Sequence, residues 1–115
     1  MNAVTIIGLG PMGQAMAKTF LERGYKVCLW NRTKSKVDNL VEEGCLYDPS
    51  IVEVIKKSEF VLVSLTNYDV FFDIFENAKK YLKGKVIGNL SSGTPQEARK
   101  ANRWIIKQGG RFLSA

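Results

Sequence analysis

Apolar residues in this chain form short β-branched runs that alternate with stripes at helical spacing. The first run, Val4-Thr5-Ile6-Ile7, is typical of a buried strand, and it is followed by a helical stripe of Met12, Ala15, Met16, Thr19 and Phe20. Glycines separate the two patterns, so the period changes across a glycine turn. The pattern therefore predicts a strand over residues 3–9 and a helix from Pro11 to about Arg23 that ends at Gly24.

The same alternation continues along the rest of the chain. Further strands are predicted over residues 26–30, 45–47, 60–65, 85–89 and 111–114. The helices between them are predicted from Thr33 to Gly44, after Asp48-Pro49, over the stripe from Phe71 to Leu82, and from Thr94 to Gly109. Six strands with a helix between each consecutive pair, and right-handed crossovers, predict an α/β fold: a doubly wound parallel six-stranded sheet in the Rossmann order 3-2-1-4-5-6.

Three local details of the helices are also predicted. Asp48 is expected as an N-cap with Pro49 at the first helical position, and Val41 is expected to face inward with Val37 and Leu40. Thr94-Pro95-Gln96-Glu97 has the pattern of a capping box.

The carboxyl ends of the first and fourth strands, where the winding reverses, are where such a sheet binds its ligand. The glycine turn falls there, and its residues are Gly8, Leu9, Gly10, Pro11, Met12 and Gly13. In a dinucleotide site Gly8 allows the sharp bend, Gly10 lets backbone approach a pyrophosphate, and Gly13 lets helix and strand pack closely. The alternative interpretation is a flexible glycine loop.

The loop after the second strand has Asn31-Arg32-Thr33 where a cofactor with a free ribose 2′-hydroxyl usually meets an acid. Because guanidinium binds phosphate through paired hydrogen bonds, this loop favours a 2′-phosphate and hence NADP(H). A surface turn that caps the second helix is the alternative.

Two further loops are predicted at the same edge of the sheet. Leu65-Thr66-Asn67 follows the fourth strand and contacts the second ribose of a cofactor, unless Asn67 only caps the next helix. Ser91 and Ser92 follow the fifth strand and lie near the nicotinamide or the substrate, although capping alone explains Thr94. Trp30 and Tyr68 are interpreted as packing residues.

Composition narrows the possible functions. The chain has 115 residues, no histidine, two cysteines and a net charge of +6, so it suits one domain without Ser-His chemistry or the usual zinc sites. Cys28 and Cys45 are interpreted as small hydrophobic residues. The basic residues are spread over four elements with acids nearby, which favours solvated helix faces over a nucleic-acid surface. We expect no membrane span and a cytoplasmic location, because no apolar run or leader pattern is present.

The whole chain resembles the NADP-binding domain of the β-hydroxyacid dehydrogenase superfamily, which includes 3-hydroxyisobutyrate dehydrogenase and 6-phosphogluconate dehydrogenase. Gly8-Leu9-Gly10-Pro11-Met12-Gly13, Trp30-Asn31-Arg32-Thr33 and Asn89-Leu90-Ser91-Ser92-Gly93-Thr94-Pro95 are most similar to the imine reductase branch. The dehydrogenases usually have an Asp and a Ser-Thr pair in the last stretch, so Asn89 and Ser91-Ser92 argue against a plain hydroxyacid enzyme.

The resemblance implies an NADPH-binding domain of an oxidoreductase with an imine or carbonyl substrate. Members of the superfamily continue into an interdomain helix, which carries the catalytic Lys or its replacement, and into a helical domain that forms the homodimer. Neither follows Ala115, so residues 1–115 are expected to be the cofactor-binding part of a longer enzyme, inactive alone. The alternative is a stand-alone NADPH-binding or sensing module, and a basic nucleic-acid-binding domain is a third hypothesis.

Overall fold

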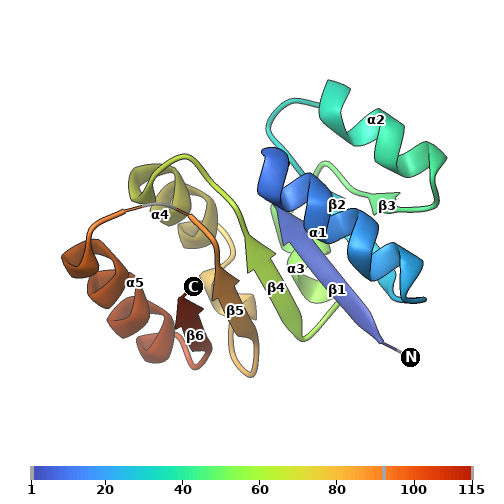
Figure 1. Ribbon diagram of the computed structural model, residues 1–115. Coiled ribbons are helices and arrows are strands. Elements are labelled where there is room, and N and C mark those ends of the chain that lie inside the picture. The colour runs from blue at the N-terminus through green and yellow to red at the C-terminus, as the bar shows by residue number, and fades with distance from the viewer. Residues whose placement is uncertain (1, 92, 115) are drawn as a thin grey trace.

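Six parallel strands form one sheet in the order β3-β2-β1-β4-β5-β6 in the computed structural model, which describes residues 2–91 and 93–114 (Figure 1). The strands are β1 (Ala3–Ile7), β2 (Lys26–Trp30), β3 (Leu46–Tyr47), β4 (Phe60–Val63), β5 (Val86–Asn89) and β6 (Arg111–Ser114). The helices are α1 (Pro11–Glu22), α2 (Ser35–Glu42), α3 (Ile51–Lys56), α4 (Tyr68–Glu76), a short 3₁₀ helix η1 (Lys79–Tyr81) and α5 (Pro95–Lys107). The predicted fold and strand order are confirmed.

Two hydrophobic clusters lie on the two faces of the sheet because successive strand residues point to opposite sides. Val4 and Ile6 of β1 pack with residues of α1 and α2, such as Ala17 and Leu40. Ile7 belongs to the other cluster, which is built mainly from β4, β5 and the helices α3, α4 and α5. The two central strands are therefore buried on both faces, as the apolar runs predicted.

The start of α3 differs from the sequence prediction. Ser50, and not Asp48, is the N-cap, and its side chain accepts a hydrogen bond from the Glu53 backbone N–H at 3.3 Å. The Asp48 carboxylate instead accepts from the Ser50 N–H at 2.8 Å. Asp48 thus forms a local turn two residues before the N-cap, a conformation that Asp side chains also favour. Pro49 precedes the N-cap and is not the first helical residue, so this prediction is also wrong.

Two predicted inward faces are also partly wrong. Val41 of α2 is 42% exposed, whereas Val37 and Leu40 are buried. On α1, Met12 is 54% exposed, and the buried residues are Gly13 and Ala17. Near the glycine turn only small residues fit the inner face of α1, so Met12 remains outside. Further along the helix Met16 and Phe20 are half-buried and pack against the core as predicted, whereas Ala15 and Thr19 are exposed.

The helical stripe predicted from Phe71 to Leu82 is divided between α4, which ends at Glu76, and η1. Several predicted boundaries move by one to three residues, so that β1 ends at Ile7 and β4 at Val63. The capping box at Thr94 and Glu97 is confirmed. Cys28 and Cys45 are both buried and free. In the described part of the chain, no helix is long and apolar enough to cross a membrane, and no cluster of His, Cys, Asp and Glu suits a metal ion.

Candidate functional site

The three glycines of the first turn have different surroundings. Gly8 has φ +93°, and a Cβ built on it would lie 2.1 Å from the Ser64 carbonyl oxygen. A Cβ on Gly13 would lie 2.1 Å from the Gly8 carbonyl oxygen. Both positions therefore need glycine for the fold itself. Gly10 differs, because no atom lies within 4 Å of its Cβ position, so this glycine leaves open space beside the backbone.

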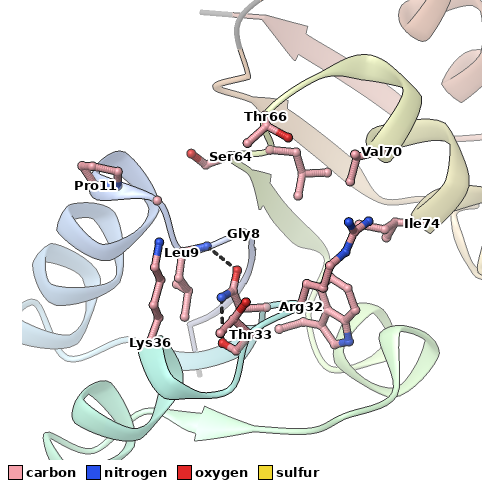
Figure 2. A pocket seen from close by; sticks show the side chains of 14 residues that line it. Gly8, Leu9, Pro11, Arg32, Thr33, Lys36, Ser64, Thr66, Val70 and Ile74 are labelled. Atoms are coloured by element: carbon pink, nitrogen blue, oxygen red, sulfur yellow. Dashed lines mark hydrogen bonds between the residues drawn. The ribbon is translucent and has the colours of Figure 1, made fainter.

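That space belongs to a pocket of about 360 Å³ at the carboxyl ends of β1, β2 and β4 (Figure 2). Three loops meet there: the glycine turn, the loop after β2 and the loop after β4. The lining residues are Gly8, Leu9, Gly10, Pro11, Trp30, Asn31, Arg32, Thr33, Lys36, Ser64, Leu65, Thr66, Val70 and Ile74. The structure thus brings together residues from all three of the segments that the sequence placed around the ribose and pyrophosphate.

The Asn31 side chain joins two of these loops. Its Oδ1 accepts a hydrogen bond from the Leu9 backbone N–H at 2.9 Å, and its Nδ2 donates to the Thr33 carbonyl oxygen at 2.8 Å. The Gly8 N–H donates to the Trp30 carbonyl oxygen at 2.9 Å. Asn31 therefore fixes the glycine turn to the loop after β2, a role that the sequence interpretation of this loop did not include.

Two cations line the pocket, and none of the described residues that line it is Asp or Glu. Both Arg32 and Lys36 are exposed. In Figure 2, Lys36 rises beside Leu9, whereas the Arg32 side chain extends toward Ile74. The sequence interpretation did not identify Lys36 as a site residue, because it lies in the first turn of α2 next to other surface lysines. The only signal that distinguishes Lys36 from those lysines is its distance from the end of β2.

The beginning of α1 suits an anion. Gly10 is the N-cap and makes no side-chain capping bond, Pro11 occupies the first turn, and that turn contains no acid. The first N–H groups of a helix have no partner within the helix, and the helix dipole is positive there. An open helix start beside open backbone is the arrangement that binds phosphate in dinucleotide sites.

The other predicted site residues lie outside this pocket. Met12 projects into solvent, and Gly13 is buried under the turn. Asn67 caps α4, with its Oδ1 accepting from the Val70 N–H at 3.0 Å. Ser91 lines a separate hollow that includes Tyr68, Leu90, Gly93 and Thr94. Ser92 lies outside the described residues.

The residues interpreted as packing residues do pack, and they also contact the site region. Trp30 packs against the core and lines the pocket, while its Nε1–H donates to the Pro49 carbonyl oxygen at 3.1 Å. Tyr68 is only 3% exposed. Burial raises the pKa of the Tyr68 phenol and Glu97 raises it further, although the hydrogen bond from Asn89 acts in the opposite direction. Tyr68 therefore stays protonated at neutral pH.

Comparison with known proteins identifies the family. A family model described as the NAD binding domain of 6-phosphogluconate dehydrogenase matches residues 3–115. The chain belongs to this family. As a NAD(P)-binding domain, it has a glycine turn that leads from β1 into an open helix start.

Three of the proteins that this NAD(P)-binding domain resembles are reductases or a reductive aminase by name. It is 38% identical over 110 residues to an NADPH-dependent reductive aminase of Aspergillus oryzae, covering 96% of this chain and 37% of that one. It is 38% identical over 114 residues to glyoxylate/succinic semialdehyde reductase 1 of Arabidopsis thaliana, covering 96% and 39%. An imine reductase structure from Bacillus cereus superimposes with a TM-score of 0.95 at 49% identity, covering 99% and 40%. The chain thus spans about two fifths of the length of the relatives that it matches.

Proposed function

We propose that this chain is the cofactor domain of an NADPH-dependent oxidoreductase that reduces a C=N or C=O bond. The observation that carries the proposal is the pocket that contains both the open backbone at Gly10 and two cations, Arg32 and Lys36, and that has no carboxylate among its described lining residues. The similarity to a reductive aminase described as NADPH-dependent supports the choice of cofactor, and the similarity to an imine reductase supports the substrate class.

Each loop has a role in this proposal. The Gly10 backbone and the first turn of α1 bind the pyrophosphate, because the fold leaves their N–H groups and the space beside them open. Arg32, Lys36 and the Thr33 hydroxyl bind the 2′-phosphate, with Asn31 holding their loop in place. The proposed cofactor-binding residues are Gly8, Leu9, Gly10, Pro11, Met12, Gly13, Asn31, Arg32, Thr33, Lys36, Leu65, Thr66, Asn67 and Ser91.

Bound NADPH would supply a hydride from C4 of its nicotinamide to the carbon of the C=N or C=O bond. The residues of this chain bind and orient the cofactor, and none of them is assigned as proton donor. We propose that the proton donor, the rest of the substrate site and the homodimer contacts lie outside residues 1–115, since the relatives are much longer than this chain.

Titration of the purified 115-residue chain with NADPH, followed by nicotinamide fluorescence, tests this function. The expected result is saturable binding, with no NADPH oxidation above a blank without protein when a cyclic imine or a short aldehyde acid is added. Absence of binding would contradict the proposed cofactor site. Oxidation above the blank would contradict the assignment of the proton donor to another part of the enzyme.

A further inference from the structure

A buried amide connects the end of β5 to the start of α4. Asn89 is only 1% exposed, and its Nδ2 donates a hydrogen bond to the Tyr68 hydroxyl oxygen. Its Oδ1 accepts from the Ser91 backbone N–H at 3.2 Å. Both ends of the amide are therefore used, which fixes the orientation of Asn89 and the first residues of the loop after β5.

The same loop is fixed to the end of β4. The Ser91 Oγ accepts a hydrogen bond from the Leu65 backbone N–H at 2.8 Å. A serine hydroxyl has one proton to donate, and no acceptor for the Ser91 proton is present among the described residues. Because the Leu65 N–H occupies one side of the oxygen, the remaining proton is restricted to directions away from β4. Ser91 lines a hollow, so its hydroxyl can donate to a ligand there.

The Tyr68 ring packs against the loop after β5. A Cβ built on Gly93 would lie 2.5 Å from Cε2 of the Tyr68 ring, so the loop runs directly over the ring. The ring in turn packs against Phe71, with ring centroids 5.6 Å apart. One tyrosine thus contacts Gly93 of the loop through its ring and Asn89, at the end of β5, through its hydroxyl.

The side-chain hydrogen bonds at this edge of the sheet form two separate sets. One set joins Leu9 and Thr33 through Asn31, on the side that binds the adenosine half of the cofactor in the proposed function. The other set joins Leu65, Ser91, Asn89 and Tyr68. Among the described residues, no side chain makes hydrogen bonds in both sets, so we expect a change in one set to act mainly on its own half of the site.

We propose that Tyr68 and Asn89 are positioning residues for the nicotinamide half of the cofactor, which act by fixing Ser91 and the loop after β5. This inference rests on the proposed function. It assigns the adenosine half to the Asn31 set and the nicotinamide half to the Tyr68 set.

Calorimetric titration of Tyr68→Phe with NADPH and with adenosine 2′,5′-bisphosphate tests the inference. Removing the phenol oxygen leaves the Asn89 amide without its acceptor, so NADPH binding is expected to weaken roughly three- to tenfold. The affinity for adenosine 2′,5′-bisphosphate, which lacks the nicotinamide half, is expected to stay within about twofold. Gly93→Ala, which pushes the loop away from the ring without removing a hydrogen bond, is expected to give the same selective loss.

Tyr81→Phe is the matched control, because Tyr81 is 40% exposed and lies on η1, away from this network. It is expected to change neither affinity. Equal losses for both ligands, or no loss for either, in folded Tyr68→Phe and Gly93→Ala would overturn this inference but not the proposed function. Failure of the unsubstituted chain to bind either ligand would overturn the proposed function and the inference with it.

Discussion

At the scale of single residues, two cations and one amide have different roles in the site. Arg32 and Lys36 supply charge at the pocket, while Asn31 supplies geometry by joining the Leu9 N–H to the Thr33 carbonyl. The sequence identified Arg32 because it lies in the loop where an acid is usual. It did not separate Lys36 from neighbouring lysines, nor show that the Asn31 amide is already used within the protein.

Substitution of each cation by alanine tests whether the two cations bind the 2′-phosphate. Arg32→Ala and Lys36→Ala are each expected to weaken NADPH binding about tenfold, the lower end for a charged hydrogen bond because both side chains are exposed. NADH binding is expected to stay nearly unchanged, since the glycine turn is untouched. Lys34→Ala is the control, because Lys34 is exposed nearby but does not line the pocket. Calorimetry with equal losses for both cofactors would show that the two cations do not bind the 2′-phosphate.

At the scale of elements, the strand, turn and helix at the start of the chain contain two kinds of glycine. Gly8 and Gly13 are required by backbone contacts of 2.1 Å that any side chain would make, whereas Gly10 has open space. The spacing of the three glycines predicted all of these roles, because a tight connection between a buried strand and a close-packed helix leaves few alternatives. The N-cap of α3 could not be predicted in the same way, since Asp48 and Ser50 are both good capping residues.

Substitution by alanine is therefore expected to lower stability at Gly8 and to lower NADPH affinity at Gly10. Gly8→Ala places a side chain at φ +93° against the Ser64 carbonyl and is expected to lower the free energy of unfolding by about 2–5 kcal/mol. Gly10→Ala is expected to change the free energy of unfolding by no more than about 1 kcal/mol. It is expected to weaken NADPH binding by roughly tenfold or more, because the added methyl group fills the space for the pyrophosphate. Thermal melts and titrations on the same samples measure both quantities. A Gly10→Ala variant that binds NADPH normally would contradict the assignment of this space.

The edge formed by β2 and β3 gives a pH-dependent prediction. Burial, with a smaller contribution from the Glu43 carboxylate, raises the pKa of the Cys45 thiol to about 11. An unfolded thiol loses its proton near pH 8.5, so between that pH and about 11 the unfolded state binds fewer protons than the folded state. The free energy of unfolding is therefore expected to fall as pH rises through this window.

Comparison with Cys45→Ala isolates this effect, because every other titratable group, including the Cys28 thiol, is common to both proteins. The fall in the free energy of unfolding, measured by urea denaturation, is expected to be shallower in Cys45→Ala. Identical slopes in the two proteins would show that the thiol does not contribute.

At the scale of the whole molecule, the strand order brings three distant loops to one edge of the sheet. The sequence predicted this order because alternating strands and helices with right-handed crossovers allow few arrangements. It could not predict that Asn31 and Asn89 anchor two separate hydrogen-bond sets, since the partners Leu9 and Tyr68 become neighbours only in the folded chain. The site is therefore built from a predictable scaffold and from amide contacts that only the structure reveals.

The central claim is that this edge of the sheet binds NADPH through its 2′-phosphate. Calorimetric titration of the 115-residue chain with NADPH and with NADH under the same conditions tests it most directly. With one or two charged contacts to the phosphate, we expect roughly ten- to several-hundred-fold tighter binding of NADPH. Equal affinities for the two cofactors, or tighter binding of NADH, would contradict the account.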